Sequence, residues 1–327
     1  MSNKLQRRPK VTNILITGAG GFIGGHLVNY FSKKSNVKIR AVDIKPLSNW
    51  QQLNQKAENL SLDLKSLENC RVITRGIDEV YNLAADMGGM GFIENNKALC
   101  MLNVLINTHM LIAATQAKVK RFFYSSSACV YALDKQTRSK TKGLRESDAY
   151  PAMPEDGYGW EKLMMERACR HFMEDYGLPT YVARFHNIYG PLGTYDGGKE
   201  KSPAALCRKV ATNSVNLDIW GNGEQTRSYC YIDDCIEGLY ALMNSKCHEP
   251  VNIGTERAVS INELADIIMA IANKKLQKAY DVSKPQGVQA RNADITKAAI
   301  ILGWFPEVQL EEGIRRTYLW IKGKISQ

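Results

Sequence analysis

Short apolar runs alternate with longer amphipathic segments in the first half of the chain. The apolar runs are typical of buried strands, and we expect strands at 13–17, 38–43, 60–64, 79–85, 121–127 and 180–184. Between them, apolar positions recur with the period of a helix, which predicts helices over about 22–33, 95–118 and 158–176. Strands that alternate with helices indicate β-α-β units. We therefore expect an α/β fold built on a doubly wound parallel sheet.

The pattern changes after residue 186. A Gly- and Pro-rich stretch occupies 187–203, and a loop of this length inside a compact protein is usually functional. Helices are predicted beyond it over about 204–211, 233–243, 261–272, 295–302 and 310–322. We expect residues 1–185 to form the sheet domain. Residues 186–327 should form mainly a smaller substrate-binding domain, with some segments returning to the first.

A glycine-rich turn follows the first predicted strand. A tight turn, a close approach of backbone to a pyrophosphate and close helix–strand packing all exclude side chains. The amides at the start of the following helix then bind phosphate oxygens. Between a strand and a helix, this pattern predicts a Rossmann-type cofactor cradle made of Gly18, Gly20, Gly21, Phe22, Ile23 and Gly24.

Asp43 ends the second predicted strand, at the distance where a carboxylate binds the adenosine ribose and repels a 2′-phosphate. It favours NAD over NADP as the cofactor, although the nearby Lys45 weakens that preference. Asp63 is a candidate for binding the adenine. Both acids are also ordinary residues at a solvated strand end, and that alternative is stronger for Asp63.

Ser127, Tyr158 and Lys162 form the next candidate constellation. Tyr158 and Lys162 are four residues apart and share one face of a predicted helix. An ammonium and a nicotinamide charge favour the tyrosinate. A tyrosine with a lowered pKa can then accept a hydroxyl proton while hydride leaves for the cofactor. The spacing is common by chance, but it becomes specific beside the glycine turn and the serine run that ends at Ser127.

Together these motifs resemble the extended short-chain dehydrogenase/reductase family and its nucleotide-sugar branch. The resemblance also rests on 82–85, 125–127, 184–191, 231–234 and 252–254. It implies an NAD-dependent enzyme in which Ser127, Tyr158 and Lys162 are catalytic and Tyr158, Lys162 and Ala84 contact the cofactor. Homodimers formed through helices at about 95–118 and 158–176 are also typical of such proteins.

A narrower resemblance is to the subfamily of GDP-mannose 3,5-epimerases. It is carried by 85–91, 126–131, 197–205, 223–228 and 291–292. It implies epimerisation of a GDP-sugar, GDP-mannose first of all, at C3 and C5 through a transient 4-keto intermediate. Catalytic acid–base roles fall on Cys129 and Lys201. The implied substrate contacts are Gly88, Gly89, Met90, Gly91, Ser127, Asn187, Lys201, Lys209, Arg227 and Arg291.

The chemistry of such a reaction explains these residue types. A ketone at C4 acidifies the hydrogens at C3 and C5, and inversion needs a base on one ring face and an acid on the other. A thiol titrates nearer neutral pH than an alcohol, and a lysine near a cofactor cation has a lowered pKa. Arg227 and Arg291 suit bidentate pyrophosphate contacts. Taken alone, Cys129 is as readily a buried cysteine that only packs and has no chemical role. Lys209 is as readily a solvated residue on a helix surface.

Other activities of the same fold stay open. A GDP-heptose epimerase, a C4-epimerase and a 4,6-dehydratase all use this hydride chemistry. A dehydratase would need a carboxylate beside Ala128 or Cys129, and the sequence has none there. A non-catalytic NAD-binding protein is the alternative from another class, but such proteins commonly lose the tyrosine or the lysine, and this chain keeps both.

Composition narrows the possible partners. The formal charge is +10, yet Lys and Arg are spread along the chain, so a nucleic-acid partner is not expected. We identify no stretch of about 18 apolar residues and expect no membrane span. Eight cysteines without a Cys-x-x-Cys pair, accompanied by five histidines, predict neither disulfides nor a metal site and fit a reducing cytoplasm. The basic leader 1–10 resembles a disordered tail more than a targeting peptide.

Overall fold

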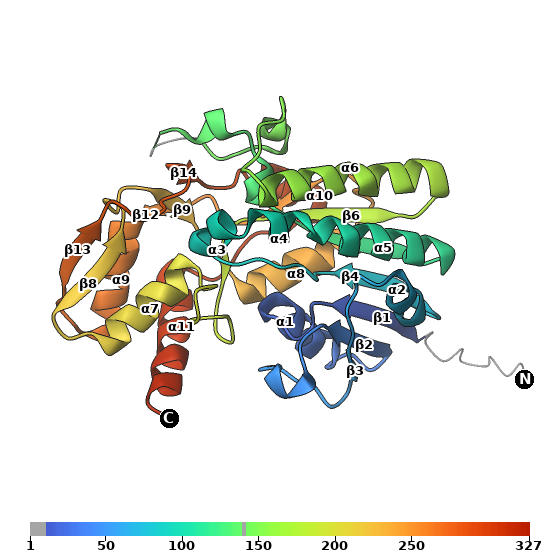
Figure 1. The fold of residues 1–327 in the computed structure, drawn as a ribbon, viewed down its shortest axis with the longest axis horizontal. Helices are drawn as coiled ribbons and strands as arrows, with labels where there is room; N and C mark the ends of the chain where they lie inside the picture. The colour runs from blue at the N-terminus through green and yellow to red at the C-terminus, as the bar shows by residue number, and fades with distance from the viewer. Residues whose placement is uncertain (1–10, 139–141) are drawn as a thin grey trace, which may run out of the picture.

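A parallel sheet of seven strands forms the centre of the larger lobe (Figure 1). The computed structural model describes residues 11–138 and 142–327, so the basic leader lies outside the described residues. The strand order is β11-β6-β5-β4-β1-β2-β3 and every neighbouring pair is parallel, which confirms the predicted α/β class. The strands are β1 (Thr12–Thr17), β2 (Val37–Asp43), β3 (Glu58–Ser61), β4 (Glu79–Asn82), β5 (Arg121–Ser127), β6 (Thr180–Phe185) and β11 (Val251–Ile253).

Apolar side chains cover both faces of this sheet, because helices pack on each. In β1, Ile14 and Ile16 belong to one buried cluster, whereas Leu15 between them belongs to another on the opposite face. A strand buried on both faces must be apolar at consecutive positions, which explains the uninterrupted run at 14–16. One face carries α2 (Leu67–Thr74), α5 (Asn103–Gln116) and α6 (Tyr158–Tyr176), and the other carries α1 (Phe22–Phe31), α8 (Ile232–Met243) and α10 (Thr296–Leu302).

The second half of the chain forms a smaller lobe and also completes the sheet. Figure 1 shows α7 and α9 at one end of the molecule with short strands beside them. This lobe contains α7 (Ser202–Thr212), α9 (Ile261–Ala272), α11 (Leu310–Ile325), β7 (Ile188–Tyr189), β8 (Asn216–Trp220), β9 (Thr226–Ser228), β10 (Cys230–Tyr231), β12 (Ala258–Ser260), β13 (Gln277–Asp281) and β14 (Ala290–Arg291). From the same half, β11 pairs with β6 as the outermost strand of the main sheet.

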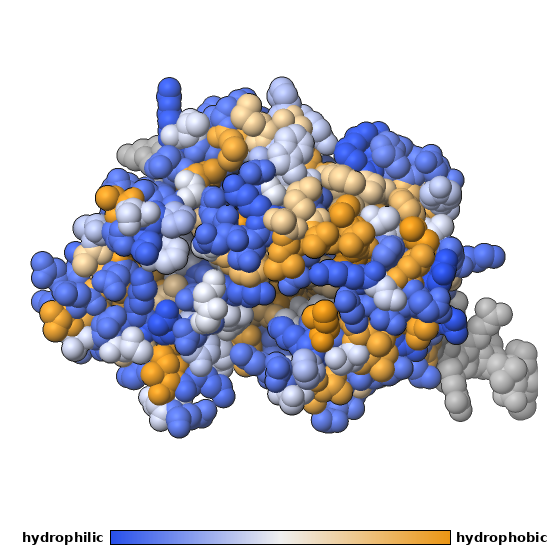
Figure 2. All heavy atoms as spheres, in the orientation of Figure 1, coloured by the Kyte–Doolittle hydropathy of each residue, from blue (hydrophilic) through white to orange (hydrophobic). Residues whose placement is uncertain are grey.

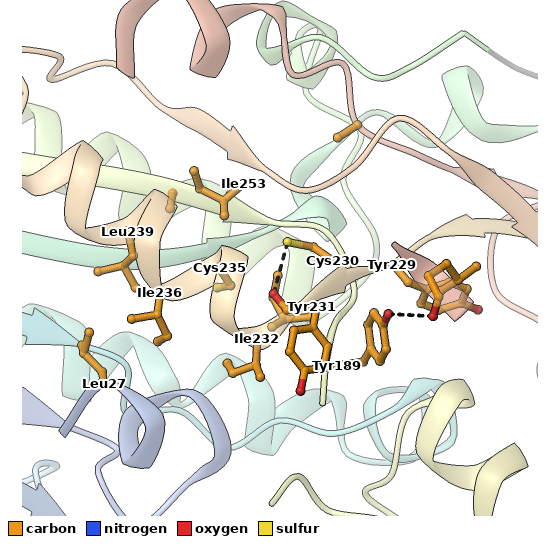
Figure 3. Close-up of a cluster of buried hydrophobic side chains, with 14 of the residues drawn as sticks. Leu27, Tyr189, Tyr229, Cys230, Tyr231, Ile232, Cys235, Ile236, Leu239 and Ile253 are labelled. Atoms are coloured by element: carbon orange, nitrogen blue, oxygen red, sulfur yellow. Dashed lines mark hydrogen bonds between the residues drawn. The ribbon is translucent and has the colours of Figure 1, made fainter. Parts of the chain in front are cut away.

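The two lobes share one buried cluster, part of which is drawn in Figure 3. Leu27 on α1 packs in this cluster with Ile232, Ile236 and Leu239 on α8 and with Ile253 on β11. Because the cluster continues into tyrosines and cysteines of the smaller lobe, the lobes are packed against each other without a solvated linker.

Some elements differ from the sequence expectation. The helix predicted over 95–118 is two helices, α4 (Lys97–Met101) and α5, divided at Leu102, and a further helix α3 (Met90–Asn95) precedes them. Asn96, with φ −134° and ψ 41°, leaves the helical conformation and separates α3 from α4. The third strand ends at Ser61, so Asp63 lies in the loop after it. Helix α2 and the two- and three-residue strands of the smaller lobe are too short to produce a recognisable period.

The stretch Lys97–Gln116 corrects the expectation that the chain has no apolar stretch long enough to span a membrane. By length and composition this stretch is apolar enough to cross a membrane. Its most apolar 18-residue segment has a mean hydropathy of 1.6, and 44% of that segment is buried in the protein. Two buried amides tie it to the sheet domain: Asn103 accepts a hydrogen bond from the Asp86 N–H at 2.8 Å, and Asn107 donates to Glu161 Oε1 at 2.6 Å. A core helix of this kind passes the same composition test.

An ion pair between α6 and β6 is buried beneath the sheet edge. Arg184 Nη2 lies 2.7 Å from Glu166 Oε2 and Arg184 Nε donates to Oε1 at 2.9 Å, with side chains 2% and 4% exposed. Ser126 Oγ also donates to Glu166 Oε1, at 2.5 Å. Removal of one partner leaves a buried charge without compensation, which is more costly than the pair itself is stabilising.

We expect Glu166→Gln to lower the free energy of unfolding by about 3–5 kcal/mol, because Arg184 keeps its buried charge. Chemical denaturation measures this. The matched control is Glu311→Gln, which breaks the bidentate but half-exposed pair between Arg257 and Glu311 and should cost under about 1 kcal/mol. Equal losses of unfolding free energy in the two variants would contradict the claim that the Arg184–Glu166 pair is costly to break because it is buried.

Candidate active site

A cavity of about 330 Å³ opens at the carboxyl ends of β1, β2, β4 and β5. Parallel strands end together at this edge, which is where open α/β sheets bind ligands. The cavity is lined by most of the residues predicted to hold the cofactor or act in catalysis. These are Gly18, Gly21, Phe22, Ile23, Gly24, Asp43, Asp63, Ala84, Ser127, Tyr158, Lys162 and Lys201.

The glycine turn is built as the cradle requires. Gly18 has φ +68°, a conformation that side-chain-bearing residues rarely adopt, and a Cβ on Gly24 would lie 2.2 Å from the Gly18 carbonyl oxygen. Gly20 does not line the cavity; its N–H donates to Asp43 Oδ2 at 3.1 Å and so ties the turn to the end of β2.

Asp43 lies where an adenosine ribose would end. Its Oδ1 accepts a hydrogen bond from the Lys45 N–H at 3.0 Å, while its Oδ2 holds the turn. Lys45 Nζ donates to the Gly20 carbonyl oxygen at 3.1 Å, away from this carboxylate. Asp63, in the next loop, accepts from the Lys65 N–H at 2.8 Å. The glycine turn, which has no side chains in the way of a pyrophosphate, and the Asp43 carboxylate beyond it fit a dinucleotide without a 2′-phosphate, which is NAD.

Tyr158 and Lys162 lie on the first turns of α6, facing the cavity. Lys162 Nζ is 5.4 Å from the centroid of the Tyr158 ring and 4.9 Å from that of Tyr124. Burial raises the pKa of Tyr158 well above its ordinary value, and Cys129 and Glu161 raise it further, whereas a hydrogen bond with Ser127 lowers it. The chain by itself therefore favours the neutral phenol, because desolvation outweighs the hydrogen bond with Ser127, and the tyrosinate expected beside a bound, positively charged nicotinamide stays a prediction.

A buried chain of hydrogen bonds supports Lys162 from behind. Thr17 Oγ1 donates to Asn82 Oδ1 at 2.8 Å, Asn82 donates to Asn107 Oδ1 at 2.8 Å, and Asn107 donates to Glu161 Oε1 at 2.6 Å. Glu161 Oε2 lies 3.7 Å from Lys162 Nζ. The strand before the glycine turn and the catalytic lysine are thus positioned by one network.

Cys129 lies just beyond the cavity, in a cluster with two charged residues. Arg291 Nη1 donates to the Cys129 Sγ at 3.2 Å and lies 3.2 Å from Glu155 Oε2. The Cys129 N–H donates to Ser127 Oγ at 3.2 Å. Burial and the Glu155 carboxylate raise the pKa of this thiol to about 11, although Arg291 opposes them. The free chain therefore holds this thiol protonated at neutral pH, although its pKa stays nearer neutral than that of an alcohol.

Lys201 caps α7 and reaches the same region from the opposite lobe. Burial lowers its pKa, and the charge of Cys129 acts on it in the raising direction. Lys199 also lines the cavity, with its Nζ 4.3 Å from the Phe92 ring centroid and 4.0 Å from Asp86 Oδ1. Lys201 is thus the lysine whose electrostatics are coupled to the thiol.

The glycines at 88–91 approach the protein's own loop. The Gly89 N–H donates to the Lys199 carbonyl oxygen at 3.0 Å, and a Cβ on Gly89 would lie 2.3 Å from the Glu200 oxygen. Cβ atoms on Gly88 and Gly91 would meet the rings of Phe92 and Trp220. These glycines do not line the cavity; the structure shows a close approach to the lysine loop, and the predicted contact with a sugar stays a prediction.

Arg227 and Arg291 lie together on the smaller lobe's side of Cys129. Burial lowers the pKa of Arg227 to about 10, and the charge of Arg291 contributes. Arg291 Nη2 is buried and has no hydrogen-bond partner in the part of the chain that the structure describes. A Cβ on Gly287 would lie 2.6 Å from Met90 Cε and 3.5 Å from Arg227, so Met90 belongs to this group. Two adjacent guanidinium groups, one buried and one half-buried, suit an anion.

Two predicted substrate residues make internal hydrogen bonds. Asn187, at φ 45°, donates to the Ser228 carbonyl oxygen at 2.9 Å. Lys209 Nζ donates to the Asp218 carbonyl oxygen at 2.7 Å, and burial lowers its pKa. Neither lines the cavity, so their predicted substrate contacts stay predictions.

Sequence reasoning missed Glu155, Gln136 and Glu161. Gln136 Oε1 accepts from Arg291 Nε at 2.7 Å and so fixes the guanidinium that faces Cys129. Glu155 precedes Tyr158 by three residues in a Pro-rich segment, where an acid resembles any loop residue. Among the described residues, no group of three or more His, Cys, Asp or Glu could hold a metal ion.

The sheet, the glycine cradle and the Ser–Tyr–Lys group define a nucleotide-dependent oxidoreduction site on a Rossmann-type fold. The model of the NAD dependent epimerase/dehydratase family matches residues 14–254, and the chain belongs to this family. Its cofactor is NAD.

Proteins with similar sequences narrow the class. The chain is 44% identical over 321 residues to GDP-mannose 3,5-epimerase of Arabidopsis thaliana, covering 96% of this chain and 83% of the relative. It is 45% identical to GDP-mannose 3,5-epimerase 1 of Oryza sativa subsp. japonica, covering 96% and 82%.

Solved structures agree in fold. UDP-glucose 4-epimerase of Thermotoga maritima with UDP-glucose superposes with a TM-score of 0.86 at 27% identity, covering 96% of this chain and 100% of that one. UDP-glucuronic acid 4-epimerase of Bacillus cereus in complex with UDP-glucuronic acid and NAD gives 0.83 at 28% identity, with the same coverage.

We expect Asp43→Ala to reduce the preference for NAD over NADP by at least about tenfold, because the carboxylate that repels a 2′-phosphate is removed. Binding of each cofactor, followed by fluorescence titration, measures the ratio. Asp63→Ala, which removes another carboxylate from the same cavity, should leave the ratio unchanged. An unaltered ratio in Asp43→Ala would show that Asp43 only anchors the glycine turn.

Proposed function

We propose that this chain is an NAD-dependent isomerase that epimerises GDP-mannose at C3 and C5. One observation carries the proposal: Lys201 lines the cavity together with Tyr158, and Cys129 packs with Tyr158 in one buried cluster, so that a thiol and an amine from opposite lobes flank the tyrosine. A C4-epimerase needs the tyrosine and the cofactor alone. A pair of proton-transfer groups from two lobes is what inversion at a carbon beside the ketone requires. The relatives of similar sequence support GDP-mannose as the substrate.

The hydride step uses residues of the larger lobe. Bound in the glycine cradle beside Asp43, NAD would supply a hydride acceptor and donor for C4. Tyr158 accepts the C4 hydroxyl proton, Ser127 holds that hydroxyl, and Lys162 stabilises the phenolate that forms. The positive nicotinamide ring opposes the effect of burial on the tyrosine, so the phenol ionises most easily when the cofactor is oxidised.

The inversion steps use the Cys–Lys pair. Lys201, whose pKa burial lowers, removes a proton from a carbon beside the ketone, and the Cys129 thiol delivers a proton to the other face. This leaves an ammonium and a thiolate. A second inversion with the transfer directions reversed then restores the neutral amine and the thiol. Two inversions therefore return the pair to its starting state.

Substrate binding falls to the smaller lobe. Arg291 is buried and Arg227 is half-buried beside it on the neighbouring strand, and the Arg291 Nη2, which has no hydrogen-bond partner among the described residues, suits a pyrophosphate oxygen. A second cavity of about 490 Å³ adjoins this pair through Gly287; it is lined by Glu94, Leu133, Glu155, Asp156 and 285–288. The diphosphate and the sugar would thus meet where the two lobes join.

A homodimer is part of this proposal. Figure 2 shows apolar side chains gathered over α4, α5 and α6, among which Met101, Leu102, Leu105 and Met164 are exposed. A second copy that packs its own α5 and α6 on this face would cover them. A monomer by light scattering at micromolar concentration would contradict it.

In deuterium oxide, we expect the protein to place deuterium at C3 and C5 of GDP-mannose without net formation of NADH. Cys129→Ala should lower this exchange by roughly 10²–10⁴-fold, because the acid–base thiol is lost. Tyr158→Phe should abolish it, because no ketone forms. NMR spectroscopy measures both positions.

Cys100→Ala is the matched control, since Cys100 packs in the same small buried cluster as Cys129 and Tyr158, whereas it is Cys129 that accepts the hydrogen bond from Arg291. Its exchange should equal that of the unmodified protein. Wild-type exchange in Cys129→Ala would remove the mechanism. A product that has lost water would instead identify a dehydratase, and inversion at C4 alone a C4-epimerase.

A further inference from the structure

The structure brings a carboxylate to the thiol that the sequence does not place beside it. Glu155 and Cys129 are 26 positions apart, yet the Glu155 N–H donates to the Cys129 carbonyl oxygen at 3.0 Å. Both residues are buried. This backbone contact fixes Glu155 at the start of the turn that leads into α6, so its side chain is directed at Cys129 by the fold.

The side chains complete a cluster of three groups. Arg291 Nη1 serves as the shared donor, 3.2 Å from the Cys129 sulfur and 3.2 Å from Glu155 Oε2. Gln136 accepts from Arg291 Nε at 2.7 Å and keeps the guanidinium from turning away. The thiol hydrogen is then available to the carboxylate.

We propose that Glu155 is a positioning residue that keeps Cys129 in its thiol form in the free enzyme, ready to deliver a proton. This rests on the proposed acid–base function of Cys129. With Glu155 ionised, the carboxylate and Arg291 balance each other and the thiol is neutral. Loss of the thiol proton would leave two anions around one guanidinium in a buried site, which is unfavourable.

The charges around the sulfur agree with this assignment. The pKa of Cys129 is raised by burial and then by Glu155, while that of Glu155 is held low by Arg291 and by its hydrogen bond with the thiol. The proton therefore stays on sulfur. The other ionisable groups that act on Cys129, or on which it acts, are Tyr158, Lys201 and Arg227.

Glu155→Gln tests the proposal because the amide is nearly isosteric and its oxygen can still accept from Arg291. With the carboxylate neutralised, the unbalanced guanidinium favours the thiolate. We expect the midpoint of Cys129 ionisation to fall by at least about one pH unit, a tenfold change in the thiolate-to-thiol ratio at a fixed pH. Thiolate ultraviolet absorbance against pH measures it, with the corresponding Cys129→Ala protein subtracted.

Asp156→Asn is the matched control. It removes one negative charge from the adjacent residue, whose exposed carboxylate pairs with Lys97 at 3.1 Å. Its midpoint should stay at the wild-type value. Equal midpoints in Glu155→Gln and wild type, or an equal shift in Asp156→Asn, would overturn the proposal. Because burial also raises the pKa of this thiol, water admitted to a loosened site would lower the midpoint as well; the rate at which a neutral reagent alkylates the Cys129 thiolate must therefore stay at the wild-type value in Glu155→Gln.

Folding is checked by thermal melting and NAD binding, and Glu155→Ser is a second neutral variant that must show the same downward shift. The titration needs no substrate. A shifted midpoint without epimerisation of GDP-mannose would therefore sustain the role of Glu155 while contradicting the proposed reaction. In an active enzyme, the pH at which deuterium exchange declines on the alkaline side should move down in Glu155→Gln.

Discussion

The structure depends on one constraint: charged side chains are buried where water does not reach them. A parallel sheet covered on both faces leaves its functional groups one place to gather, the edge where the strands end, and that edge is itself covered by the second lobe. Each ionisable side chain brought there loses hydration, so each needs a partner. Arg184 has Glu166, Arg291 has Glu155, and Lys162 has Glu161 behind it.

The same desolvation supplies the chemistry. It moves the pKa of the Cys129 thiol up and that of the Lys201 amine down. Two groups whose ordinary pKa values differ little are thereby separated into a proton donor and a proton acceptor. The second lobe is therefore part of the acid–base machinery, because its packing excludes the water that would otherwise leave both groups at their ordinary values.

Much of the framework follows from the sequence. Consecutive apolar residues at 14–16 predict a strand buried on both sides, and Gly18 and Gly24 occupy positions that a side chain would obstruct. The cofactor-site residues from the first half reach one cavity because strand ends of a parallel sheet are neighbours in space, whatever their separation in the chain.

What the sequence could not predict depends on contacts between distant segments. Glu155 looks like a loop acid until β14 brings Arg291 beside it. No carboxylate lies beside Cys129 along the chain, and this is the argument against a dehydratase. In the folded protein, however, the Glu155 carboxylate lies beside Cys129. The break at Asn96 and the raised pKa of Tyr158 likewise depend on packing, which propensity does not describe.

The outermost strand β11 has a consequence for how the molecule can be divided. It comes from the second half of the chain, as do α8 and α10, which cover one face of the sheet. A fragment that stops after β6 would leave the β6 edge unpaired and would lose α8 and α10, so that α1 alone of the three helices would remain on the face of Ile14 and Ile16. Neither half is then a self-sufficient module. Exchange of substrate-binding segments between relatives must leave 232–253 in place, so specificity can be transplanted only as loops grafted on either side of that segment.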